Sequence, residues 1–153
     1  MNAIDQRLRD LGIDLGAPAP PVASYAPVVL HRGLAYVSGQ LPRGDQGILS
    51  GRVGESVDLT AAAAAARLCA ISVLSVLRRS LDGDLGRVSQ CLQLSGFVAA
   101  SPGFEAHAQV VNGASDLMIA VFDDRGRHAR AAVGVASLPF GAPVEISAVF
   151  AVV

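Results

Sequence analysis

The chain has 153 residues, of which 52% are hydrophobic and 16% are charged, and its formal net charge is −1. This length predicts a single domain. The near-zero charge excludes a chain-wide basic excess of the kind that nucleic-acid-binding proteins present to phosphates, so we expect no nucleic-acid partner.

The apolar content is high for a soluble chain, in which about a quarter of residues are normally charged. A membrane span needs about 20 consecutive apolar residues, whereas the most apolar segment, residues 68–77, is shorter and has arginines at both ends. The N-terminal segment lacks the apolar stretch of a signal peptide. We therefore expect no membrane association, and we expect a partner subunit to cover the excess apolar surface.

The two cysteines, Cys69 and Cys91, lie far apart in apolar surroundings and form no CxxC pair. Their placement predicts buried free thiols in a reducing compartment, rather than a disulfide framework or a zinc site. With no targeting segment in view, this predicts a cytoplasmic protein.

The N-terminal third predicts a short helix, a tether and a hairpin. Residues 4–11 form an amphipathic stretch, and residues 17–21 (APAPP) predict an extended tether because proline interrupts helices. Residues 28–31 and 34–38 predict two strands joined by a tight turn. The glycine-rich segment 44–54 lacks the Gly-Lys-Ser/Thr ending of a phosphate-binding loop, which predicts an ordinary surface loop.

The remaining chain predicts two long helices and three strands. The first helix should begin after Asp58 as the N-cap, run to about Ser80 and stop at Asp82-Gly83. The second should begin at Ser101-Pro102 and extend to about residue 123. We expect strands at residues 87–99, 128–136 and 144–152. The spacing of apolar residues predicts a buried stripe on the first helix and inward-facing positions on the strand at residues 87–99. The helix stripe consists of Leu59, Ala62, Ala66, Cys69, Val73 and Leu77. The inward positions of the strand are Val88, Leu92, Leu94 and Val98.

This order of elements predicts an α+β single domain, a mixed sheet with two long helices on one face. Two helices cannot cover both faces of a sheet of four to six strands. The uncovered face needs another partner, which agrees with the excess apolar content and predicts an oligomer.

Two charged residues stand out in the apolar C-terminal third. Arg130 and Glu145 are each isolated in an otherwise apolar strand, and an unpartnered buried charge is costly. The two could simply pair with each other or face solvent. Alternatively, Arg130 receives a ligand carboxylate through its planar guanidinium, and Glu145 handles a proton or a water. The histidines His31, His107 and His128 show no metal-ligand spacing, so we expect no metal site.

Four motifs occur in an order found in one known family. Residues 129–139 (ARAAVGVASLP) and 144–146 (VEI) resemble the closing signature of the Rid family, the reactive-intermediate or enamine/imine deaminases, often labelled endoribonuclease L-PSP or translation inhibitor. Residues 37–42 (VSGQLP) resemble the Ser-Gly-Gln-Ile/Leu-Pro motif of that family. Residues 23–25 resemble its Gly-Pro-Tyr motif, and Asn112 resembles its helix asparagine. The resemblance covers residues 24–153.

The resemblance implies a chorismate-mutase-like fold and a homotrimer with a central barrel and ligand clefts between neighbouring subunits. It implies that Arg130 binds the substrate carboxylate and that Glu145 positions or activates the attacking water. The implied substrate contacts are Tyr25, Ser38, Gly39, Asn112 and Ala132. Deaminating members hydrolyse an imine derived from an amino acid to a 2-oxo acid and ammonia, without a metal or organic cofactor. The expected ligand is therefore a small carboxylate-bearing imine or 2-oxo acid.

The chain also departs from the family pattern. Ala132 stands where the deaminase archetype has a cysteine, which puts any role of a thiol in doubt. Residues 1–23 form an extension before a Rid-like domain at residues 24–153, and the loop after Pro42 is longer, so the chain resembles a divergent, longer subgroup. Whether Arg127 and His128 join the site stays open.

The sequence is compatible with three main functions. The first is hydrolytic deamination of enamines and imines. The second is a non-catalytic trimer that binds 2-oxo acids or related carboxylates. An endoribonuclease ranks third, because the chain lacks a basic excess and a histidine pair for acid–base cleavage. A chorismate mutase rests on fold analogy alone.

Overall fold

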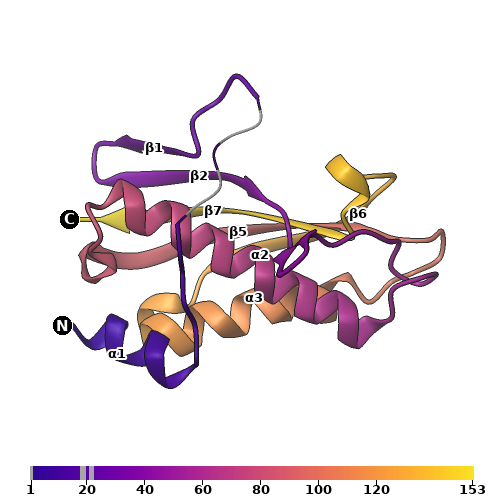
Figure 1. Ribbon diagram of the computed structural model, residues 1–153, viewed down its shortest axis with the longest axis horizontal. Coiled ribbons are helices and arrows are strands. Elements are labelled where there is room, and N and C mark those ends of the chain that lie inside the picture. Colours follow the sequence, from indigo (N-terminus) through magenta and orange to yellow (C-terminus); the bar gives the residue numbers. More distant parts are fainter. Residues whose placement is uncertain (1, 18–19, 21–22) are drawn as a thin grey trace.

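The computed structural model describes residues 2–17, 20 and 23–153, so Pro18, Ala19 and Pro21 of the expected tether lie outside the described residues. Five strands form one sheet in the order β1-β2-β7-β5-β6 (Figure 1). Strands β5 and β6 run parallel, and the other neighbours run antiparallel. The strands are β1 (Val28–His31), β2 (Leu34–Gln40), β5 (Val88–Ala99), β6 (Ala129–Val135) and β7 (Val144–Val152).

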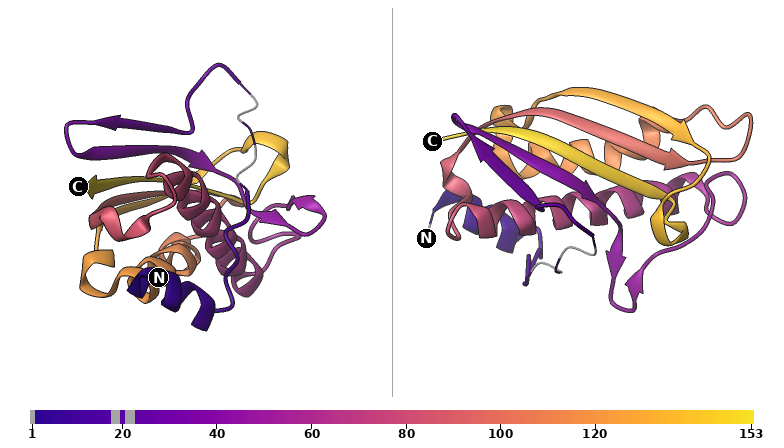
Figure 2. Two further views of the ribbon diagram at one scale, coloured as in Figure 1. Left: turned by 60° about the vertical axis from the view of Figure 1, so that its left-hand side comes forward. Right: turned by 90° about the horizontal axis from the view of Figure 1, so that it is seen from above.

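Two long helices, α2 (Leu59–Ser80) and α3 (His107–Phe122), pack against each other and cover one face of the sheet. Both views in Figure 2 show the helices on one side of the sheet only. A short helix, α1 (Ala3–Asp10), packs on α3 and buries Ile4 and Leu8 in the common core. The predicted α+β class and mixed sheet are confirmed.

Helix α2 begins where its sequence predicts. The Asp58 carboxylate accepts a hydrogen bond from the Ala61 amide at 2.8 Å, which caps the first turn. Most of the predicted stripe is completely buried, but Leu59 is 41% exposed. This part of the prediction was wrong, because Leu59 lies at the first position of the helix, beyond the edge of the packed layer.

By length and composition alone, helix α2 is apolar enough to cross a membrane. Half of its most apolar stretch is buried inside the protein, where it contacts α3 and β7. The core helix of a soluble domain shows the same pattern. The thiols of Cys69 and Cys91 are free and buried, and burial raises the pKa of Cys91 to about 12.

The register of β5 differs from the predicted alternation. Val88 and Leu94 are buried as expected, but Leu92 is 38% exposed and Cys91 takes the inward position. The pairing of β5 with β7 shifts between Val88 and Gln90 and again between Cys91 and Gln93. Each irregularity reverses the side of the sheet toward which the following side chains point. The prediction from simple alternation therefore failed at Leu92.

Two further predictions were wrong. Helix α3 begins at His107, not at Ser101, because residues 101–105 form a turn in which the Ser101 amide donates to the Val53 carbonyl. The predicted loop 44–54 contains part of a small hairpin, β3 (Arg43–Gly44) with β4 (Gly47–Ile48). Gly47 has a φ of 107°, a conformation that favours glycine and permits the tight turn.

The other face of the sheet carries no helix from the described part of the chain. Phe97, Ser147 and Val149 are only half-buried there, and Tyr36 is 47% exposed. On the edge strand β1, Val29 and Leu30 are also about half exposed. An exposed apolar face of this kind commonly marks an interaction surface.

Candidate active site

The two principal site residues lie on opposite faces of the sheet. Arg130 on β6 is the register partner of Leu94, whereas Glu145 on β7 is the partner of Phe97. Leu94 and Phe97 are three positions apart in a regular part of β5, and side chains alternate between faces along a strand. Leu94 is completely buried under the helices, so Arg130 faces the helices and Glu145 faces the open side. The two residues do not pair with each other.

Arg130 is held by hydrogen bonds from helix α3. Its Nη1 atom donates to Asn112 Oδ1 at 2.7 Å and to Ser115 Oγ at 3.2 Å. Nε and Nη2 make no hydrogen bond within the described residues, and no described carboxylate lies within 4.0 Å. Two donors of a fixed, exposed guanidinium therefore remain for a ligand.

His128 extends this network beneath Arg130. Its Nδ1 atom lies 2.6 Å from the Gly126 carbonyl oxygen, and its Nε2 atom lies 2.8 Å from Ser115 Oγ. Because a carbonyl oxygen only accepts, Nδ1 donates to Gly126, and in the tautomer with its one proton on Nδ1 the Nε2 atom accepts from the Ser115 hydroxyl. The Ser115 oxygen in turn accepts from Arg130, so one directed chain of hydrogen bonds fixes the guanidinium.

Arg127, the other neighbour considered for the site, makes no side-chain contact with the Arg130 network within the described residues. Its Nε atom lies 3.3 Å from Asp124 Oδ1, and its side chain is 69% exposed. Within one chain, His128 therefore contacts the Arg130 network through Ser115, whereas Arg127 pairs locally with Asp124.

Glu145 is placed by packing and not by hydrogen bonds. Its side chain is half-buried, and this burial raises the pKa of its carboxyl group. No hydrogen bond or opposite charge from the described residues offsets the rise. Gly39 on β2 makes room for the carboxylate, because a Cβ atom at this position would lie 2.5 Å from Glu145 Oε1.

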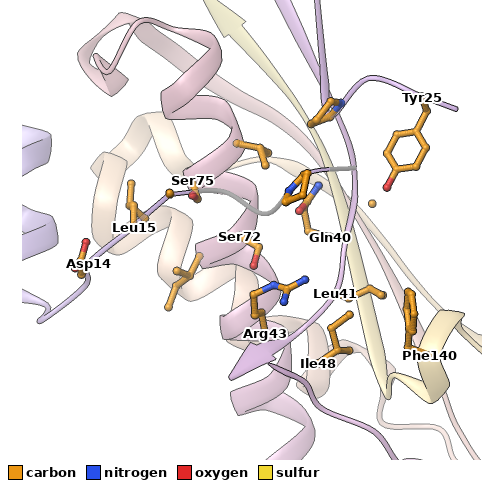
Figure 3. Close-up of a pocket in the computed structure, with 16 residues that line it drawn as sticks. Asp14, Leu15, Tyr25, Gln40, Leu41, Arg43, Ile48, Ser72, Ser75 and Phe140 are labelled. Carbon is orange, nitrogen blue, oxygen red and sulfur yellow. The ribbon is translucent and has the colours of Figure 1, made fainter. Parts of the chain in front are cut away.

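Ser38, next to Gly39 in the chain, holds the segment that contains Tyr25 against strand β2. Its Oγ atom donates to the Ala26 carbonyl at 2.7 Å, and its amide donates to the Pro27 carbonyl at 2.9 Å. These bonds hold the segment before β1 against β2, and Tyr25 and Gly39 line the same cavity as a result (Figure 3).

The structure thus divides the predicted residues into two groups. The cationic group combines Arg130 and Asn112, with Ala132 two residues further along the same face of β6. The acidic group combines Glu145 with Gly39 and its chain neighbour Ser38, and Tyr25 shares with it only the cavity that Gly39 lines. Within the described part of the chain, no three His, Cys, Asp or Glu side chains gather as metal ligands.

Ser115 is the site residue that sequence reasoning missed. It follows Asn112 by three positions, which places both on one face of a helix, and it is polar in an apolar stretch. This spacing was the available signal.

Comparison with known proteins relates the chain to one family. Residues 16–153 match the family model described as Endoribonuclease L-PSP. Protein TCP17 of Trypanosoma cruzi is 48% identical over 143 residues, which are 92% of this chain and 89% of TCP17.

Two solved structures share the fold over nearly the whole chain. A protein of unknown function from Agrobacterium tumefaciens is 44% identical, with a TM-score of 0.92 over 98% of this chain and 92% of that one. A candidate endoribonuclease from Shewanella oneidensis is 25% identical, with a TM-score of 0.94 over 99% of this chain and 100% of that one. The family match spans every residue of both groups.

Proposed function

Because the chain belongs to the Rid family, the family described as endoribonuclease L-PSP, we propose that it is an enamine/imine deaminase. Its substrate is an imine derived from an amino acid, and its products are a 2-oxo acid and ammonia. The observation that carries this proposal is the Arg130 guanidinium, fixed by α3 through Nη1 with Nε and Nη2 turned to no described partner.

Arg130 supplies the anchor for the substrate carboxylate. A guanidinium binds a carboxylate through two parallel hydrogen bonds, which fix orientation as well as position. Since Asn112 and Ser115 already immobilise one end of the group, little conformational freedom is lost when the substrate binds.

Glu145 handles the proton of the attacking water. Its carboxylate accepts a proton as the water oxygen bonds to the imine carbon, and the imine nitrogen takes a proton from solvent to give a tetrahedral carbinolamine. The protonated Glu145 then gives its proton to the amino nitrogen, the C–N bond breaks and ammonia leaves, and the hydroxyl group loses its proton to solvent as the C=O bond of the 2-oxo acid forms. A carboxyl group whose pKa is raised by burial is better matched to proton transfer near neutral pH than an exposed one.

The cationic group of one subunit and the acidic group of a neighbouring subunit together form one site. Arg130 and Glu145 face opposite sides of the sheet in one chain, so a substrate that contacts both requires a second subunit. The half-exposed apolar face of the sheet offers a surface for such assembly. We infer a homotrimer with a central barrel, in which the Arg130 group of one subunit faces the Glu145 group of its neighbour.

The test is hydrolysis of 2-aminoacrylate generated in situ, followed by release of the 2-oxo acid. Wild-type protein should accelerate release, and Arg130→Ala should lower kcat/KM by about 10- to 100-fold, since a hydrogen bond to a charged group is worth about 1.5–3 kcal/mol. Arg79→Ala, which removes an exposed arginine of α2, is the matched control. No acceleration by folded wild-type protein on this and a wider imine panel would reject the deaminase.

A binding protein without turnover is the second candidate, and Ala132 is the observation that favours it. If the thiol of the family archetype is needed for chemistry, the Arg130 anchor would still bind a 2-oxo acid. Saturable 2-oxo acid binding that is lost in Arg130→Ala, with no imine hydrolysis, would establish this alternative. RNA cleavage that survives rigorous purification and vanishes in one site variant would instead favour an endoribonuclease.

A further inference from the structure

The cavity that Tyr25 and Gly39 line extends along helix α2, on the helix side of the sheet. It has a volume of about 240 Å³, slightly below the range of about 300–1,000 Å³ that is usual for small-molecule sites. Helix α2, the end of β2, the hairpin β3–β4 and the segment after α1 form its walls (Figure 3). Arg130, Asn112 and Glu145 are not among its lining residues, and it shares only Tyr25 and Gly39 with the candidate active site.

Ser75 is an unsatisfied polar group in the wall of this cavity. Its side chain is only 6% exposed, and its Oγ atom makes no hydrogen bond within the described residues. Helix serines commonly bond to the carbonyl four positions earlier, but Ser75 does not. A buried hydroxyl without a partner is unfavourable, so this group is available to a ligand that enters the cavity.

A cation and two further polar side chains lie near Ser75. Arg43, on β3, makes no ion pair or hydrogen bond through its side chain within the described part of the chain. Figure 3 shows its guanidinium beside Ser72 and Gln40, between α2 and β2. The nearest acid of the lining, Asp14, instead accepts a hydrogen bond from the Gly16 amide at 2.9 Å.

Most of the remaining lining is apolar. Leu15 comes from the segment after α1, and Ile71 and Val76 come from α2. The lining therefore combines a cation without a described partner and several neutral polar groups with an aliphatic wall, and Asp14 is the one acid among the lining residues. A ligand that matches it has an anionic end and a small hydrocarbon body.

We propose that this cavity is a second binding site, for a small amphipathic carboxylate. The carboxylate bonds to the Arg43 guanidinium and to the hydroxyl of Ser72 or Ser75, and the hydrocarbon body lies against Leu15 and Ile71. The site belongs to one subunit and does not use the Arg130 anchor.

The test is titration with 4-methylpentanoate, with 4-methylpentan-1-ol as the uncharged control. Affinity is measured by calorimetry, and location by the amide NMR shifts of Gln40, Ser72 and Ser75. The acid should bind saturably and shift these amides, and the alcohol should bind at least about tenfold more weakly. Arg43→Met should weaken acid binding at least about tenfold, and Ser75→Ala should weaken it a few-fold.

Two matched variants make the outcome decisive. Arg79→Met, which removes another exposed arginine of the described chain, should leave binding unchanged. Arg130→Met should leave the acid-induced NMR shifts of Gln40, Ser72 and Ser75 unchanged, because any carboxylate bound at Arg130 lies elsewhere. The second site is wrong if the acid does not bind, or if binding survives Arg43→Met and is lost in Arg130→Met.

Discussion

The two groups of site residues are held in place in different ways. Arg130 is exposed but fixed by a chain of hydrogen bonds through Asn112, Ser115 and His128. Glu145 has no such support among the described residues and is fixed by burial beside Gly39. Hydrogen bonds orient a charge while leaving it solvated, whereas burial changes its reactivity.

This difference suits the two groups to different roles in the proposed reaction. A fixed, solvated guanidinium suits recognition of a carboxylate, because its charge does not need to change. A half-buried carboxyl group with a raised pKa suits proton transfer, because its charge must change during the reaction. Variants of the two groups should therefore separate binding from chemistry.

The largest effect is expected from Glu145→Gln. Without a proton acceptor, kcat for imine hydrolysis should fall by about 10²- to 10⁴-fold, while KM changes little because Arg130 still binds the carboxylate. Steady-state kinetics on 2-aminoacrylate measures both constants. Glu55→Gln, at an exposed carboxylate of the loop before α2, should leave both unchanged. A rise in KM with unchanged kcat would instead make Glu145 a binding residue.

Gly39→Ala should separate placement of the acid from stability. The new Cβ atom would displace the flexible end of the Glu145 side chain, so activity should fall by up to about 100-fold with little change in melting temperature. Gly113→Ala is the contrasting variant, since its Cβ atom would clash with the backbone carbonyl of Ala63 where α2 and α3 cross. It should lower the free energy of unfolding by about 1–3 kcal/mol. Equal losses of stability in Gly39→Ala and Gly113→Ala would contradict the proposal that Gly39 serves mainly to leave space for the Glu145 carboxylate.

Ser115→Ala tests the hydrogen-bond chain beneath Arg130. Loss of one such bond, worth about 1 kcal/mol, should raise KM about fivefold without lowering kcat. Adding His128→Ala should cause little further change, because both residues act through one chain. Ser80→Ala, whose hydroxyl bonds only to the carbonyl of Val76 in its own helix, is the control. Additive effects of Ser115 and His128 would contradict a single chain.

The smallest effect is the pH dependence that Glu145 gives to stability. Burial raises the pKa of this group in the folded protein, so between the unfolded and folded pKa values the folded state binds more protons. Stability contributed by the protonated form is therefore lost as pH rises through this window. Glu145→Gln should be more stable than wild type near neutral pH and equal to it below a pH of about 4. Chemical denaturation across this range measures the difference, and a stabilisation independent of pH would contradict it.

Local patterns in the sequence predicted most of the fold. The cap at Asp58, the turn at Arg32-Gly33 and the order of the main helices and strands along the chain depend on neighbouring residues, and these predictions are confirmed. The exposed Leu92 and the late start of α3 were missed because they depend on distant contacts. The irregular register of β5 arises from its pairing with β7, and the Ser101 turn is held by the loop at Val53.

The sequence motifs nominate the candidate site residues one by one, but they do not give the arrangement of these residues in space. Motif spacing identifies Arg130 and Glu145, yet their opposite faces follow from the parallel pairing of β5 with β6 and the antiparallel pairing of β5 with β7. The raised pKa of Glu145 likewise depends on packing beside a strand that is distant in sequence.

Complementation between inactive variants tests the composite site most directly. Arg130→Ala and Glu145→Gln chains are refolded together in equal amounts, and imine hydrolysis is compared with each variant refolded alone. If each site takes Arg130 from one subunit and Glu145 from its neighbour, random assembly restores both residues in about a quarter of the sites. The mixture should then regain about a quarter of the wild-type activity. A mixture no more active than the separate variants would show that the two residues do not form one site between subunits.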